Sequence, residues 1–98
     1  MKTVLWLDDY RNPHAKCVKS GFFYTWIETY SPFKDEQVDV VWVKDYNEFV
    51  DYITTNGLPD GICFDNDLGK KLEGYDCAKW LMNYCLDNKK PLPKYSIQ

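Results

Sequence analysis

The sequence predicts a single α/β domain over residues 1–98, with a doubly wound sheet of four parallel strands in the order 2-1-3-4. Short apolar runs that lack the alternation of a half-exposed strand indicate strands covered on both faces. Helical patterns follow two of these runs, and right-handed crossovers between parallel strands then lead to the predicted order. A length of 98 residues is typical of one domain.

The predicted strands are residues 3–7, 38–43, 62–64 and 95–97. The clearest helix begins after Asp45, because Asp45 and Glu48 have the spacing of a capping box and apolar residues follow at helical intervals. Asn56-Gly57, followed by Pro59, marks its end. A second helix is predicted over residues 75–87. Its inward-facing stripe is expected to consist of Cys77, Ala78, Leu81, Tyr84 and Cys85.

Residues 14–37 show no single pattern. Aromatic residues recur there at helical spacing, whereas residues 25–30 are rich in strand formers. We expect an irregular segment that contains a short helix or an extended piece. Aromatic residues make up 17% of the chain, which is enough either to fill a small core or to leave rings on the surface. The expected surface for a protein partner is the aromatic part of residues 22–33, with Phe22, Phe23, Tyr24 and Trp26.

The composition argues against several classes of function. The formal net charge is −3 and the pI is near 5.0, whereas binding to duplex nucleic acid or to an anionic membrane needs a basic face. Only four apolar residues follow Met1-Lys2-Thr3, and no stretch approaches the roughly 20 apolar residues of a membrane span. We therefore expect a cytoplasmic protein without a membrane segment.

The chain contains four cysteines, Cys17, Cys63, Cys77 and Cys85. No two of them have C-x-x-C spacing, and the only histidine is His14, so a structural zinc site is not expected. We expect the cysteines to be buried, reduced thiols.

Carboxylates follow two of the predicted strands directly. Asp8 and Asp9 come after the first strand, and Asp65 and Asp67 come after the third. We expect these acids to converge, because the ligand crevice of an open α/β sheet lies at the carboxyl ends of its strands. Buried like charges repel one another, so a divalent cation or a basic side chain is expected to neutralise them.

Arg11 is a basic residue close to these acids in the sequence, three positions after Asp8. One interpretation is that its planar guanidinium reaches back over the acids and binds a phosphate there through two parallel hydrogen bonds. The other is a surface ion pair with Asp9 or Glu28. The sequence leaves both open.

Three segments together carry a resemblance to a known family: Leu7-Asp8-Asp9-Tyr10-Arg11-Asn12-Pro13, Phe64-Asp65-Asn66-Asp67-Leu68-Gly69 and Gly74-Tyr75-Asp76. The chain resembles the cyclic-phosphate processing receiver-like family, a branch of the response-regulator receiver fold. The resemblance implies a flavodoxin-like fold, Mg²⁺ held by Asp8 and Asp9, and Asp65 at the phosphoacceptor position. It also implies that the ligand is a cyclic phosphate on a nucleotide or an RNA end.

The sequence departs from the family pattern in two places. Asn66 stands where the family commonly has a histidine between the acids. The family also continues past the fourth strand with a His-Ser pair and an Asn-Pro-x-Gly segment, and receivers use a Thr or Ser and a later Lys there. Since the sequence stops at Gln98, we expect either a chain that is cut short or a protein that lacks the general acid/base and the phosphate-clamping lysine.

The first hypothesis is a metal-dependent cyclic phosphodiesterase or phosphohydrolase, in which Arg11 or Lys70 stabilises the charge on phosphorus and Asp67 orients a water. Its expected residues are Asp8, Asp9 and Asp65 for the metal, Arg11, Asn66 and Lys70 for the ligand, and Asp65, Asp67 and Arg11 for catalysis. The second hypothesis is a non-catalytic binding or inhibitory protein, of the kind that phages use as accessory proteins, which engages a protein partner through its aromatic surface. A signalling receiver is the third and weakest, because the switch residues are missing.

Overall fold

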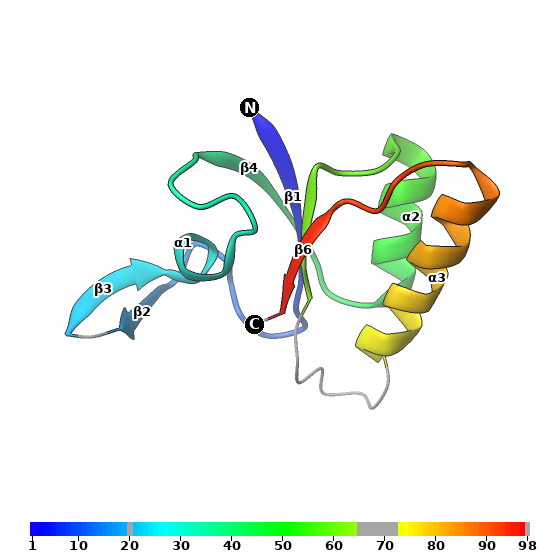
Figure 1. Cartoon of the computed structure of the whole chain (residues 1–98). Coiled ribbons are helices and arrows are strands. Elements are labelled where there is room, and N and C mark those ends of the chain that lie inside the picture. The colour runs from blue at the N-terminus through cyan, green and yellow to red at the C-terminus, as the bar shows by residue number, and fades with distance from the viewer. Residues whose placement is uncertain (20, 65–72, 98) are drawn as a thin grey trace.

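The computed structural model describes residues 1–19, 21–64 and 73–97 (Figure 1). A four-stranded sheet has the order β4-β1-β5-β6, and all its neighbouring strands are parallel. Its strands are β1 (Lys2–Leu7), β4 (Val38–Val43), β5 (Gly61–Phe64) and β6 (Lys94–Ile97). Numbered along the chain, these four strands lie in the order 2-1-3-4, which confirms the predicted topology.

Helices cover both faces of this sheet. α2 (Tyr46–Asn56) and α3 (Glu73–Asp87) pack against each other on one face, and α1 (Trp26–Tyr30) lies on the other (Figure 1). The sheet is therefore doubly wound, as the apolar strands predicted.

The side chains of β1 alternate between the two layers. Leu5 and Leu7 belong to the core cluster that includes residues of α2 and α3, whereas Val4 and Trp6 belong to the cluster that includes α1. All four side chains are fully buried. β1 reads as an unbroken apolar run because it is covered on both faces.

The structure confirms Asp45 as the N-cap of α2 and Gly57 as its end, and it places the predicted stripe of α3 on the inward side. The Asp45 carboxylate accepts a hydrogen bond from the backbone N–H of Glu48 at 2.8 Å, and Gly57 ends α2 with a φ of 85°. α3 begins at Glu73, two residues before the predicted start. Of its predicted inward stripe, Cys77, Leu81 and Cys85 are buried and Ala78 and Tyr84 are half-buried.

Residues 14–37 contain both of the structures that the sequence left open. β2 (Lys16–Lys19) and β3 (Phe22–Thr25) form an antiparallel hairpin, and α1 follows directly. The hairpin extends away from the sheet (Figure 1). Gly21 has a φ of 80°, a turn conformation that glycine adopts without strain. The mixed sequence pattern therefore reflects an extended piece and a short helix in succession.

A capping box begins α1 and was not predicted, although Thr25 and Glu28 have the required spacing. The Thr25 hydroxyl accepts a hydrogen bond from the Glu28 backbone N–H at 3.2 Å. The Glu28 carboxylate in turn accepts from the Thr25 backbone N–H at 3.1 Å and from the Thr25 hydroxyl at 2.8 Å. These bonds stabilise a helix of only five residues, which is too short to be stable by itself.

Glu28 should make the stability of this region depend on pH. The Thr25 hydroxyl and backbone N–H lower the pKa of Glu28 from its ordinary value of 4.5. Because the pKa is lower in the folded state, the stabilisation is complete above pH 4.5 and is lost as the pH falls through the folded-state pKa. We expect Glu28→Gln to be less stable than the wild type at neutral pH, and urea titrations at a series of pH values should show the difference narrowing as the pH falls below 4.5. A difference in the free energy of unfolding between the two proteins that does not change with pH would show that the charge of Glu28 is not its cause.

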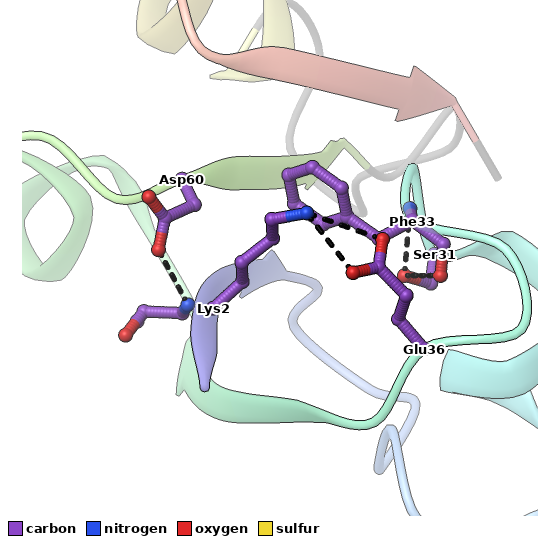
Figure 2. A network of polar contacts seen from close by, with 6 residues as sticks. Lys2, Ser31, Phe33, Glu36 and Asp60 are labelled. Carbon is purple, nitrogen blue, oxygen red and sulfur yellow. Dashed lines mark hydrogen bonds and ion pairs between the residues drawn. The ribbon is translucent and has the colours of Figure 1, made fainter.

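Polar contacts fasten the amino end of the sheet (Figure 2). The Thr3 backbone N–H donates to the Asp60 carboxylate at 2.8 Å, and Lys2 forms an ion pair with Glu36 at 3.0 Å. Gly61 has no room for a side chain, since a Cβ there would lie 2.7 Å from the Phe33 ring. These contacts anchor the starts of β1 and β5. They therefore help to hold the two strands in the register that places Leu7 beside Phe64 at their carboxyl ends.

The described cysteine side chains agree with the expectation of buried thiols. Cys63, Cys77 and Cys85 are buried and not disulfide-bonded, while the side chain of Cys17 lies outside the description. Burial raises the pKa of Cys63 to about 11, against a smaller lowering by the Ser96 hydroxyl and the charge of Lys34.

Within residues 1–19, 21–64 and 73–97, no helix has the length and apolar character needed to cross a bilayer.

Candidate functional site at the carboxyl ends of the central strands

Asp8 lies at the carboxyl end of β1, in the middle of the sheet. Leu7, the residue before it, pairs with Val43 of β4 on one side and with Phe64 of β5 on the other. The Asp8 backbone N–H donates to the Val43 carbonyl at 3.0 Å, which continues the β1–β4 ladder by one bond. Only 1% of Asp8 is exposed. The structure therefore buries a carboxyl group where a ligand crevice is expected.

The two oxygens of the Asp8 carboxyl group have different surroundings. Oδ1 accepts hydrogen bonds from the backbone N–H groups of Tyr10 and Arg11, each at 2.9 Å. Oδ2 is buried and has no hydrogen-bond partner among the described residues. An unsatisfied buried carboxylate oxygen is costly, and a hard cation that prefers oxygen ligands would satisfy it. The donor chemistry at Asp8 therefore fits Mg²⁺.

Two tryptophans fix the backbone around Asp8. The Trp42 indole N–H donates to the Asp8 carbonyl at 2.7 Å, and the Trp6 indole N–H donates to the Arg11 carbonyl at 2.9 Å. Neither residue was predicted to support the site. The available signal was that a tryptophan in a buried strand needs an acceptor for its N–H, but the sequence does not say which acceptor.

The Arg11 side chain lies on an aromatic ring that the sequence did not suggest. Its guanidinium carbon is 4.3 Å from the centre of the Trp26 ring. Of the two ion-pair partners that the sequence suggested, Glu28 instead accepts hydrogen bonds from Thr25 in the capping box. Arg11 is half-buried, so its charge remains within reach of a ligand.

The other predicted site residues divide into two groups. Asp9 is exposed directly after Asp8. The second motif supplied Asp65, Asn66, Asp67 and Lys70, and all four lie outside the described residues. The structure does place Phe64, which precedes them in the sequence, beside Leu7. The strands that lead into the two motifs thus end side by side. Within the described ranges, no cluster of three or more metal-ligating side chains is found.

A hollow of about 600 Å³ lies between α1 and β4, apart from this site. Its lining includes Ile27, Glu28, Val38 and Val40, together with His14. Neither Asp8 nor Arg11 lines it. His14 is exposed and lines this hollow.

Comparison with known proteins identifies the family. A family model described as the cyclic-phosphate processing receiver domain matches residues 3–98. The comparison with curated proteins found no match, and neither did the comparison with solved structures. The match covers nearly the whole chain and agrees with the observed strand order. The chain therefore belongs to the cyclic-phosphate processing receiver domain family.

Proposed function

We propose that this protein binds a cyclic phosphate ester together with Mg²⁺ at the carboxyl ends of β1 and β5. The observation that carries the proposal is the buried carboxyl group of Asp8, whose Oδ2 has no hydrogen-bond partner among the described residues. Family membership supports the class of ligand. The described part of the chain supports the position, because β1 and β5 are neighbours in the sheet.

Asp8 would supply the principal metal ligand through Oδ2, with Asp9, which the resemblance implies, and Asp65, which the enzyme hypothesis adds, as further ligands. When bound, Mg²⁺ would polarise a phosphoryl oxygen and lower the pKa of a bound water. Asp8 is suited to this role because its backbone is held by Val43 and Trp42 and its Oδ1 by two N–H groups. An oxygen that is already oriented loses little freedom when it binds a cation.

Arg11 would bind the phosphate through the edge of its guanidinium. Its hydrogen-bond donors lie in the plane of the group, so stacking on Trp26 leaves them available. Asn66 and Lys70 remain ligand-binding candidates, and Asp65 and Asp67 catalytic candidates, on sequence grounds alone. Opening of a cyclic ester also needs a proton donor for the leaving oxygen. Binding is therefore the core of the proposal, and turnover is an extension of it.

The direct test uses a 2′,3′-cyclic nucleotide as the probe, with and without Mg²⁺. We expect calorimetry to detect binding that depends on Mg²⁺ and is lost with a chelator, and ³¹P NMR to report any ring opening. Asp51→Asn is a suitable control, because it removes one carboxylate from the exposed surface of α2 and should bind like the wild type. The absence of binding with Mg²⁺ present would contradict the proposal.

The second candidate function is a non-catalytic protein that binds a partner through the β2–β3 hairpin. The hairpin presents Phe22 and Phe23, which are 66% and 72% exposed, together with exposed Val18. Val18 and Phe23 are register partners, so they form an apolar pair on one face. Large rings on a projecting hairpin are typical of a contact surface.

A paired set of variants separates the two functions. If a partner is captured from cell extract through the hairpin, we expect Phe22→Ser/Phe23→Ser to lose it and Asp8→Asn to retain it. Both serine substitutions are at exposed positions, so the free energy of unfolding should change by less than about 0.5 kcal/mol at each. Capture that depends on Asp8 and not on the hairpin would contradict the hairpin surface.

A further inference from the structure

We propose that Trp26 is a positioning residue for the phosphate-binding site and acts through the guanidinium of Arg11. This role rests on the proposed function, because only that function assigns Arg11 a phosphate ligand. It assigns a part in the site to α1, a segment that carries no motif residue of the family and whose aromatic residues were expected to contact a protein.

Three side chains form a continuous stack beside residues 8–15, the segment between β1 and β2 that is called the Asp8 loop below. The Arg11 guanidinium carbon lies 4.3 Å from the centre of the Trp26 ring. On α1, the rings of Trp26 and Tyr30 are stacked with their centres 5.9 Å apart and their planes inclined by 13°. Trp26 and Tyr30 are four residues apart, which brings side chains together on one face of a helix. The indole therefore has support from the phenol ring of Tyr30.

The position of Trp26 relative to Arg11 is set by backbone hydrogen bonds. The Trp26 N–H donates to the Ala15 carbonyl at 3.0 Å, and the Ile27 N–H donates to the Pro13 carbonyl at 2.9 Å. Both acceptors lie in the loop that carries Arg11. The start of α1 is thus joined to that loop, which fixes the backbone of Trp26 relative to the backbone of Arg11.

Arg11 is held at its backbone as well as at its side chain. Its N–H donates to Asp8 Oδ1, and its carbonyl accepts from the Trp6 indole, both at 2.9 Å. Among the described residues, no hydrogen bond from its guanidinium N–H groups is found. The side chain is therefore held by Trp26 through one face, and in the described part of the chain the donors at its edge have no hydrogen-bond acceptor. An arginine that is ordered before the ligand arrives binds more tightly, because less rotamer freedom is lost on binding.

A double-mutant cycle tests this role with inorganic phosphate and Mg²⁺ as the probe. The four proteins are the wild type, Trp26→Leu, Arg11→Ala and the double variant, and phosphate affinity is measured by calorimetry. We expect Trp26→Leu to weaken phosphate binding by about fivefold to tenfold, as expected from loss of a cation–π contact. In the Arg11→Ala background the same substitution should have no further effect, because Trp26 acts only through Arg11.

A conservative variant and a spectroscopic signal keep the test independent of folding. Trp26→Phe keeps an aromatic face, so it should retain most of the affinity and the melting temperature. The Arg11 Nε–H proton should be shifted upfield by the Trp26 ring in the wild type and should lose that shift in Trp26→Leu. If Trp26→Leu does not fold, Trp26→Met, which also removes the aromatic face, replaces it in the cycle together with its own Arg11→Ala double variant.

The possible results separate this inference from the proposed function. An equal loss of affinity in both backgrounds would assign Trp26 a purely structural role and overturn the inference, as would unchanged affinity in Trp26→Leu. If the wild type binds phosphate and Arg11→Ala binds it equally well, the site stands but the inference is wrong. If the wild type binds neither phosphate nor a cyclic nucleotide with Mg²⁺, both are wrong.

Discussion

Asp8→Asn is expected to abolish the stabilisation of this protein by Mg²⁺ and to weaken binding of the cyclic phosphate by at least about 100-fold. Removing a residue that only orients a metal ligand already lowers metal affinity by about 10- to 100-fold. Asp8 is the proposed ligand itself, so its loss should cost at least as much. For the wild type, Mg²⁺ at about ten times its dissociation constant should add about 1.4 kcal/mol to the free energy of unfolding. In a domain of this length, that is an increase of about 5–10 °C in melting temperature.

The asparagine variant is chosen because it changes the charge and keeps most of the local structure. Its amide oxygen can still accept the two backbone hydrogen bonds, from Tyr10 and Arg11, that Oδ1 accepts in the wild type. Asp8→Ala would remove that acceptor and would mix loss of the loop with loss of the metal ligand. Differential scanning calorimetry over a Mg²⁺ series measures the effect, with Asp51→Asn as the charge-matched control. An Asp8→Asn protein that keeps the full Mg²⁺ response would show that the metal binds elsewhere.

Phe49→Ala is expected to lower the free energy of unfolding by about 4 kcal/mol. Phe49 is completely buried, and its ring lies 6.1 Å from the ring of Phe64 and 6.2 Å from that of Trp80. It therefore joins α2 to the end of β5 and to α3. A small domain typically has only about 5–15 kcal/mol of stability, so this loss is a large part of the total.

The matched control is Phe23→Ala, which removes the same atoms from a ring that is 72% exposed. Its effect on the free energy of unfolding should stay within about 0.5 kcal/mol. Urea titrations followed by far-UV circular dichroism measure both variants, and the midpoint should fall clearly only for Phe49→Ala. Similar losses at the two positions would mean that the hairpin rings pack into the core. Because Phe64 directly precedes Asp65, we also expect Phe49→Ala to weaken cyclic phosphate binding.

The core of the fold could be predicted because its signals are local in the sequence. Val4, Leu5, Trp6 and Leu7 form an unbroken apolar run, and such a run is typical of a strand covered on both faces. Asp45 and Gly57 mark the two ends of α2 through caps that involve only neighbouring residues. The parallel order then follows from the handedness of the crossovers. Asp8 directly follows the β1 run, so the same pattern places it at the carboxyl end of a central strand, where it is buried.

The hairpin and α1 were harder to predict because their signals overlap. Aromatic residues from Phe22 to Tyr30 suit a strand by propensity and a helix by spacing, so periodicity alone does not locate the change. The capping box at Thr25 and Glu28 marks where the helix begins. Its spacing is visible in the sequence, but so short a helix forms only where tertiary contacts hold it.

The sequence by itself determined the strand order, the position of Asp8 at the end of a central strand and the family to which the chain belongs. Only the tertiary structure decided that Trp42 and Trp6 hold the Asp8 loop and that Arg11 lies on Trp26. The first set depends on hydrophobic periodicity and on turn chemistry between neighbours in the chain. Contacts such as that of Trp42 with Asp8, 34 residues apart, depend on how packed elements meet, and no local pattern encodes them.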